Sequence, residues 1–95
     1  MEIGMIIRAL NDKLRREILD ILKAGSLSAG EISKHFLVSD AAVSRHLSIL
    51  KEAGLVRAIR KGKYIYYELS PSVVDEVVIW LEGLNPEKSD SKNAD

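Results

Sequence analysis

The chain contains no cysteine among its 95 residues. Disulfide bonds, thiolate metal ligands and thiol-based redox sensing are therefore excluded. No apolar run approaches the roughly 20 residues that a membrane-spanning helix needs. The first residues also lack the basic start, long apolar core and small-residue cleavage site of a secretory signal. These absences predict a cytoplasmic protein without membrane insertion.

The chain has no net charge, but its charges are unevenly distributed. Residues 41–67 contain six basic side chains and one acidic side chain, a net charge of +5. Residues 68–95 contain seven acidic and two basic side chains, a net charge of −5. A confined basic segment is the electrostatic footprint of a nucleic-acid-binding protein, even when the whole chain is neutral.

Residue combinations that support catalysis or metal binding are also missing. The sequence offers no nucleophile paired with a base, no glycine-rich phosphate loop and no pair of carboxylates placed to share a cleft. The two histidines, His35 and His46, fall on different predicted helices without a carboxylate partner. We therefore expect no enzymatic activity, no bound metal and no cofactor.

The length corresponds to one small domain. A domain of this size buries only about 60 to 65% of the surface of its unfolded chain, so a partner subunit would add stability. We expect a folded DNA-binding domain over residues 1–84. Residues 85–95 contain no apolar residue except Ala94 and are expected to form a disordered tail.

The first predicted helix begins near Ile6 and ends at Gly25. Apolar residues recur three and four positions apart over this stretch, and Gly25 occupies the position of a helix C-terminal cap. This spacing predicts a single amphipathic helix of about 18 to 20 residues. Ile3 and Met5 add more apolar surface before it than one small domain requires.

Two short helices are predicted next. Ser28 and Glu31 form a capping box that starts the first of them. That helix ends by Leu37, and after about three residues Ser39 caps a second helix over about residues 40–53. This order is the helix-turn-helix arrangement, although a generic helical hairpin would share it.

The second of these helices has an apolar side and a polar side at roughly 100° per residue. The polar side begins with short side chains, which suits close approach to a DNA major groove. An ordinary solvated face is the alternative for this helix taken alone. The residues of the helix and its cap that we expect to bind DNA are Ser39, Asp40, Ala41, Ser44, Arg45 and Ser48.

From residue 55 the spacing of apolar residues changes from a helical repeat to alternation at every second residue. Two β-prone runs, 55–60 and 64–69, flank a lysine-glycine-lysine sequence and predict a hairpin with a basic tip. We assign the odd-numbered residues of the second run to the core. A charged tip can protect a sheet edge from aggregation, but after a helix-turn-helix it favours a wing that contacts phosphates. The wing residues expected to bind DNA are Arg60, Lys61 and Lys63.

Ser70 and Pro71 are typical of the start of a helix, and the last predicted helix runs to Leu84. Its apolar residues cover roughly 160°, which is more than one small domain needs. We expect the first and last helices to form a homodimer interface, with packing inside a single chain as the alternative for Trp80. The expected interface residues are Ile3, Ile6, Ile7, Val77, Trp80, Leu81 and Leu84.

These elements make a mainly α fold with a small β-hairpin, the winged helix-turn-helix. Six short segments are the most characteristic part of the sequence, above all those between residues 43 and 69. They are ALND (9–12), RREIL (15–19), VSRHLSIL (43–50), AGLV (53–56), RKGK (60–63) and YEL (67–69). On these segments the chain resembles the ArsR family of bacterial and archaeal transcriptional repressors.

The resemblance implies a homodimer that binds a roughly palindromic double-stranded operator and represses by occupying a promoter. Family DNA contacts carry over to the start of the recognition helix and to the wing residues already named. Asp40 and Ala41 depart from the amide and hydroxyl side chains common there, so the family's base preferences do not carry over. Members that sense metals use cysteines, or aspartate and histidine on the last helix, which here has no histidine.

Our interpretation is a metal-independent, sequence-specific DNA-binding regulator, a homodimeric repressor or autorepressor. It uses a recognition helix at about residues 40–53 and a wing at about residues 57–67. Repression would be relieved by a protein partner or by synthesis and decay. A winged helix that binds proteins without specific DNA binding is the alternative. His46 belongs to the family motif but projects among apolar residues, so we predict a structural role for it.

Overall fold

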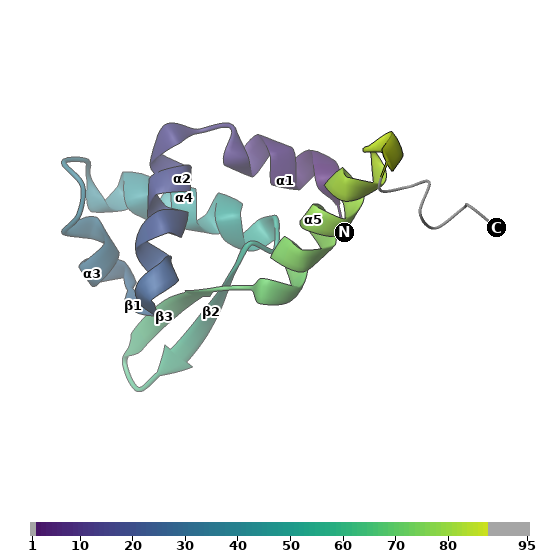
Figure 1. Cartoon of the computed structure of the whole chain (residues 1–95). Helices are drawn as coiled ribbons and strands as arrows, with labels where there is room; N and C mark the ends of the chain where they lie inside the picture. Colours follow the sequence, from purple (N-terminus) through teal and green to yellow (C-terminus); the bar gives the residue numbers. More distant parts are fainter. Residues whose placement is uncertain (1, 88–95) are drawn as a thin grey trace.

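Helices and a three-stranded antiparallel sheet form the part of the chain that the computed structural model describes, residues 2–87 (Figure 1). The elements in order are α1 (Ile3–Leu10), α2 (Lys13–Ile21), the 3-10 turn η1 (Leu22–Ala24), β1 (Leu27–Ser28), α3 (Ala29–Ser33), α4 (Asp40–Glu52), β2 (Val56–Lys61), β3 (Tyr64–Leu69) and α5 (Pro71–Gly83). The winged helix-turn-helix prediction is therefore confirmed. No helix within residues 2–87 is long and apolar enough to cross a lipid bilayer.

The single long first helix predicted from the sequence is wrong. The chain breaks at residues 11 and 12 into α1 and α2, and η1 continues α2 to Ala24. Asp12 has extended backbone angles, and its carboxylate accepts a hydrogen bond from the backbone N–H of Arg15 at 3.1 Å. This is an N-cap that starts a new helix. The apolar spacing continues across the break, so periodicity alone did not reveal it.

The start of the helix-turn-helix follows the predicted capping. Ser28 accepts a hydrogen bond from the backbone N–H of Glu31, and the Glu31 carboxylate accepts one from the backbone N–H of Ser28. However, α3 ends at Ser33, so residues 34–39 connect it to α4 and the expected connection of about three residues was too short. Phe36 packs against the core from within this connection, which holds the longer turn to the domain.

The end of α4 is fixed by a backbone motif centred on Gly54. The N–H of Leu55 donates to the carbonyl of Leu50 at 3.0 Å, and the N–H of Gly54 donates to the carbonyl of Lys51 at 2.9 Å. This is a Schellman motif, which needs a left-handed residue after the helix. Gly54 supplies it with φ of +79°. The chain then turns directly into the wing.

The wing is an antiparallel hairpin of β2 and β3, as predicted. Its turn contains two residues, Gly62 and Lys63, of which only Gly62 has a positive φ, +63°, the pattern of a type II′ turn. The prediction that the odd-numbered residues of β3 face the core is wrong for Ile65, which is 43% exposed. Ile65 lies near the hairpin tip, beyond the reach of the helices, whereas Tyr67 and Leu69 pack against the core.

The short strand β1 was not predicted. It pairs antiparallel with β3, so that Leu27 lies opposite Tyr67 and Ser28 lies opposite Tyr66, and the sheet order is β1-β3-β2. Ser28 therefore serves both this strand pair and the start of α3. The wing is thereby attached to the first helix of the helix-turn-helix.

The core is built mainly from α1 to α4 and the start of β2. Ile6 is 1% exposed and belongs to this core. The prediction that Ile6 forms a dimer interface is therefore wrong, because its side chain is already covered within one chain. The break after α1 turns this face of the helix onto the domain. The largest fully buried side chains of the core are Ile6, Ile18, Ile32, Val43, Leu47, Leu50 and Val56.

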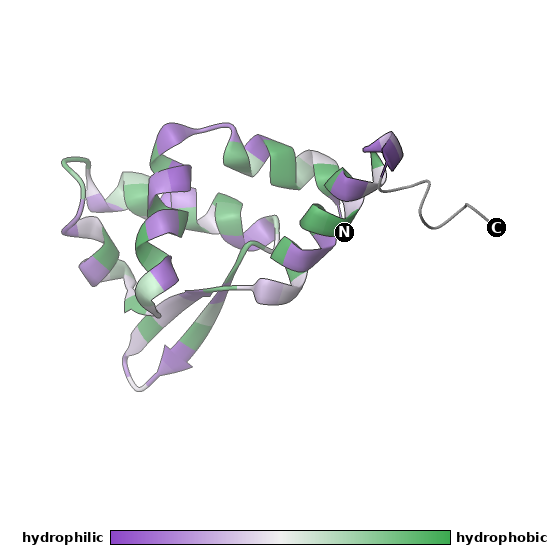
Figure 2. Ribbon diagram, in the orientation of Figure 1, coloured by the Kyte–Doolittle hydropathy of each residue, from purple (hydrophilic) through white to green (hydrophobic). Residues whose placement is uncertain are grey.

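The last helix, α5, contributes little to that core. Residues of α5 with half-buried side chains, Val73 and Val77, pack against it, and none is fully buried. In the view of Figure 1, α5 and the start of α1 both extend away from α3. Hydrophobic residues occur along these extending segments in Figure 2. Of the predicted C-terminal tail, residues 88–95 lie outside the described residues.

Candidate nucleic-acid interface

The two sides of α4 are those expected from the sequence. Val43, Leu47 and Leu50 are buried against the rest of the domain. The opposite side is open to solvent along the whole helix. All six residues of the predicted DNA contact set here are exposed, namely Ser39, Asp40, Ala41, Ser44, Arg45 and Ser48.

Ser39 and Asp40 organise the beginning of α4. The Ser39 hydroxyl accepts a hydrogen bond from the backbone N–H of Ala42 at 3.1 Å, so Ser39 is the N-cap predicted from the sequence. Asp40 lies in the first turn, where a negative side chain is favoured by the helix dipole. The same charge disfavours a phosphate at this helix end. A carboxylate here is instead suited to accept a hydrogen bond from the amino group of cytosine.

Arg45 extends from the exposed side of α4 one turn further along. Within residues 2–87 its guanidinium has no hydrogen bond and no ion pair. Its charge is therefore not neutralised by the domain itself. A free guanidinium can donate two parallel hydrogen bonds to O6 and N7 of guanine, which is the commonest specific contact in the major groove.

The basic residues of the wing point to both faces of the hairpin. Lys61 and Tyr64 are paired across the strands, and so are Arg60 and Ile65. Because side chains alternate along a strand, Arg60 and Lys61 lie on opposite faces. All three predicted wing contacts, Arg60, Lys61 and Lys63, are exposed.

Two tyrosines lie under the wing lysines. The Lys61 ammonium is 5.6 Å from the centre of the Tyr66 ring, and the Lys63 ammonium is 5.7 Å from that of Tyr64. Such cation–π contacts restrict the flexible lysine side chains. We did not predict this role from the sequence, although the alternation had placed both tyrosines on the face opposite the core.

One basic residue of the +5 segment is already engaged. Arg57 donates a hydrogen bond to the Glu68 carboxylate across the strands, at the base of the wing. Within the wing, the positive charge that remains unpaired is therefore concentrated toward the hairpin tip.

Arg15 is an important residue to which the sequence analysis gave no role. It is only 8% exposed, although it carries a charge. Its guanidinium donates to the carbonyls of Ala9 at 2.8 Å and Arg8 at 3.1 Å, at the end of α1, where the backbone carbonyls lack the partners of a continuing helix. The Arg8 carbonyl also accepts from the backbone N–H of Asn11 at 3.2 Å. The signal was present in the sequence: Arg15 shares a helix face with Ile18 and Leu22, both of which are buried.

Arg15 also contacts the recognition helix. Its Nη1 lies 3.1 Å from Nδ1 of His46 in α4. Since arginine can only donate, Nδ1 accepts and the ring carries its proton on Nε2. One side chain thus joins the end of α1, the start of α2 and the middle of α4. The structural role predicted for His46 has its physical basis in this contact.

The capping carboxylates of the domain have shifted pKa values. The hydrogen bond from the backbone N–H of Arg15 and the nearby guanidinium charge lower the pKa of Asp12 below its usual value. Hydrogen bonds from the backbone and side chain of Ser28 lower the pKa of Glu31 in the same way. Both carboxylates are therefore ionised at neutral pH.

No group of three or more metal-binding side chains comes together within residues 2–87. His46 contacts Arg15, and His35 lies beside the Phe36 ring at the end of α3, with ring centres 6.3 Å apart. Neither histidine is brought into a cluster of potential metal ligands.

Apart from Ile6, which is buried in the core, the residues predicted to form the dimer interface fall into two groups. Ile3 and Val77 are half-buried, and Val77 packs on the core. Ile7, Trp80, Leu81 and Leu84 are exposed, and Trp80 is 40% exposed. The second group leaves a large apolar surface on α1 and α5 uncovered within a single chain.

A capped helix-turn-helix with an exposed recognition face, followed by a basic-tipped hairpin, defines a winged helix-turn-helix DNA-binding protein. Residues 12–58 match the family described as bacterial regulatory protein, arsR family. The chain belongs to the ArsR family and is a DNA-binding transcriptional regulator.

Individual relatives support this assignment. Over 76 residues the chain is 42% identical to the transcriptional repressor SdpR of Bacillus subtilis, covering 80% of this chain and 84% of that one. Over 84 residues it is 32% identical to the arsenical resistance operon repressor of Staphylococcus aureus, covering 88% and 81%. The solved structure of an ArsR-like transcriptional regulator from Rhodococcus sp. RHA1 superposes with a TM-score of 0.84 at 29% identity, covering 98% and 85%.

Proposed function

We propose that the protein is a homodimeric repressor that binds a roughly palindromic operator through α4 and the wing. The observation that carries this proposal is the free guanidinium of Arg45 on an exposed helix face, in a domain whose wing also carries exposed lysines. Relatives that are named as repressors support repression rather than activation.

In this proposal the DNA contacts are of two kinds. Some recognise the bases, and others position the protein on the DNA backbone. Arg45 reads guanine, and Asp40 accepts from cytosine in the same groove. Ser44, Ser48 and Ala41 allow the helix to lie close to the base edges. Arg60, Lys61 and Lys63 contact the sugar-phosphate backbone, which sets the register without reading sequence. Ser39 contacts the DNA where α4 begins.

The dimer forms through α1 and α5, with Ile7, Trp80, Leu81 and Leu84 at its centre and Ile3 and Val77 at its edge. Each protomer then presents one α4 to one half-site, and the centres of the half-sites lie about 34 to 36 Å apart. A two-fold symmetric dimer requires a palindromic operator for the same reason.

We further infer that the protein acts in the cytoplasm, as a regulator without catalytic activity, metal or cofactor. Family membership supports a regulatory rather than a catalytic role. Relief of repression then requires a protein partner, or follows from synthesis and decay of the regulator itself.

A band-shift titration on the DNA upstream of its own gene, at several salt concentrations, tests DNA binding. The logarithm of the affinity should fall by about 0.9 per phosphate contact for each unit of log salt. Unrelated DNA of the same length is the control and should bind more weakly. No specific binding at about 50 mM salt would contradict the proposal and favour a winged helix that binds proteins.

A further inference from the structure

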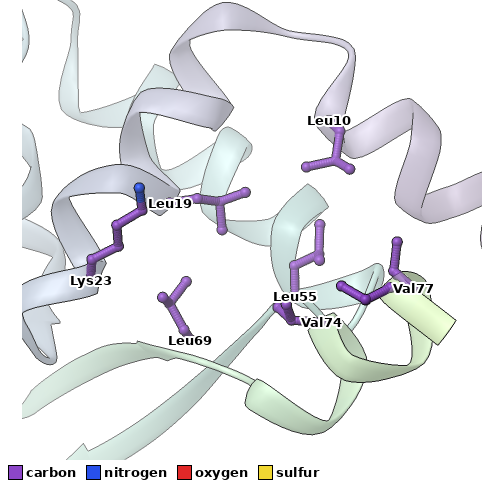
Figure 3. Close-up of a pocket in the computed structure, with 8 residues that line it drawn as sticks. Leu10, Leu19, Lys23, Leu55, Leu69, Val74 and Val77 are labelled. Atoms are coloured by element: carbon purple, nitrogen blue, oxygen red, sulfur yellow. The ribbon is translucent and has the colours of Figure 1, made fainter. Parts of the chain in front are cut away.

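An apolar pocket of about 290 Å³ is bounded by α1, α2, η1, the end of β3 and α5 (Figure 3). Seven of its eight lining residues are leucine or valine, and the eighth is Lys23. None of the lining residues belongs to the predicted DNA contact set. The pocket is therefore separate from the DNA contacts, and it shares Val77 with the predicted dimer interface.

Apart from Lys23, the side chains that line the pocket offer a ligand only apolar contacts. Leu55 at the bottom is buried, and the Leu19 and Leu69 side chains lie around the same space in Figure 3. A polar ligand group placed among them would lose its hydrogen bonds to water without replacement, which is unfavourable. A ligand must therefore be apolar along its body.

Lys23 provides the one charged group. Its ammonium pairs with Asp20 at 3.0 Å, and both side chains are largely exposed. Exposed ion pairs of this kind contribute little to stability, so the pair is easily rearranged. An ammonium also has three donors, so Lys23 can bind a second carboxylate while one donor remains on Asp20.

We propose that this pocket binds a small monoanionic amphiphile, a medium-chain aliphatic carboxylate, with its chain among the leucines and valines and its carboxylate at Lys23. The volume lies just below the range of about 300 to 1,000 Å³ that is usual for small-molecule sites, which limits the ligand to a single short chain. Val74, Val77 and Val78 of α5 form one wall. A bound ligand therefore contacts α5 on one side and Leu19 of α2 and Leu69 of β3 on the other.

Octanoate is the probe, and the full chain with labelled leucine and valine methyl groups is titrated by NMR. We expect saturable shifts at Leu19, Leu69 and Val77. Octylamine, which has the same chain and the opposite charge, should bind more weakly. Lys23→Gln should weaken octanoate binding about two- to fivefold, the effect of one exposed charge contact, and leave octylamine binding no weaker.

Val74→Phe tests the location of the site. Val74 is 42% exposed, so a larger side chain can fill the pocket from its open side without entering the core. This variant should lose octanoate binding and keep the Tm of the unaltered protein. If it unfolds, the Lys23→Gln comparison decides alone.

Three results would overturn the proposal. They are the absence of saturable shifts with octanoate, equal binding of octanoate and octylamine, and nuclear Overhauser contacts from a second copy that fills the pocket. None of these measurements involves DNA, so failure here is distinct from failure of the proposed repressor function.

Discussion

Arg45 is the side chain of α4 best suited to distinguish one base pair from another. Arg45→Ala should weaken binding to the specific operator by about 1 to 3 kcal/mol and relax preference at one base pair. Binding to unrelated DNA should change much less. Competition band shifts with operator variants measure both effects.

Lys51→Ala is the matched control because it removes the same charge from the other end of the same helix, where the side chain is also exposed. It should weaken binding to specific DNA and binding to unrelated DNA equally. An Arg45→Ala variant that does the same would show that Arg45 contacts phosphate rather than a base.

His46 should contribute to stability through its contact with Arg15. His46→Leu leaves an N–H of a largely buried guanidinium without its partner, which should lower the free energy of unfolding by about 1.5 to 3 kcal/mol. His35→Leu makes the same chemical change at an exposed position and should cost no more than about 0.5 kcal/mol. Urea unfolding of both variants gives the comparison. Equal losses would mean that the Arg15 contact carries no net stability.

Asp12 should make stability depend on acid pH. Its pKa is lowered in the folded protein, so its contribution is complete above the unfolded-state value of about 3.9 and is lost as the pH falls through the folded-state value. Asp12→Asn keeps an acceptor for the N-cap but does not titrate. Thermal unfolding between pH 7 and pH 3 should show a steeper loss for the unaltered protein. Parallel curves would exclude this linkage, since Glu31 titrates in both proteins.

The sequence predicted the positions and roles of some single residues but not of others. The exposed side of α4 followed from 100° periodicity, because burial on a helix is decided by local spacing. The role of Arg15 did not follow, because its partners are carbonyls freed by an unpredicted helix break and a histidine 31 positions away. Contacts between distant segments are not visible in a local pattern.

The same distinction holds for whole elements. The starts of α3 and α4 were predicted because each depends on side chains and backbone within a few residues. The two-residue strand β1 was missed because it exists only through its pairing with Tyr66 and Tyr67 of β3. The break between α1 and α2 was missed because apolar periodicity outweighed the N-cap signal of Asp12.

The wing is the element expected to provide much of the salt dependence. The double variant Lys61→Ala, Lys63→Ala should reduce the slope of log affinity against log salt by about 1.8, or 0.9 for each phosphate contact. Preference between operator variants should persist, since phosphate contacts carry no sequence information. Arg57→Ala is the control, because this side chain is already paired with Glu68. An unchanged slope in the double variant would remove the wing from the interface.

At the scale of the whole molecule, the apolar surface of α1 and α5 predicts association. Trp80→Ala combined with Leu84→Ala should convert the protein to monomers and weaken operator binding, because both side chains are exposed on α5 and a dimer gains from binding two half-sites together. Sedimentation velocity gives the oligomeric state.

Ile79→Ala provides a control on the same helix. Ile79 is exposed, but at 100° per residue it lies on the side of α5 away from Val77 and Leu81. It should remain dimeric. A double variant that also stays dimeric and folded would place the interface elsewhere on the surface.

The opposite charges of residues 41–67 and residues 68–95 also bear on how fast the protein finds DNA. Residues 68–87 contain five acidic and no basic side chains, and α5 extends away from α3 (Figure 1). A polyanion therefore repels this end and attracts the end that carries α4 and the wing, so encounters are turned toward the productive orientation before contact. Neutral overall charge is thus compatible with rapid association, and added salt should slow capture of the operator more than it speeds release.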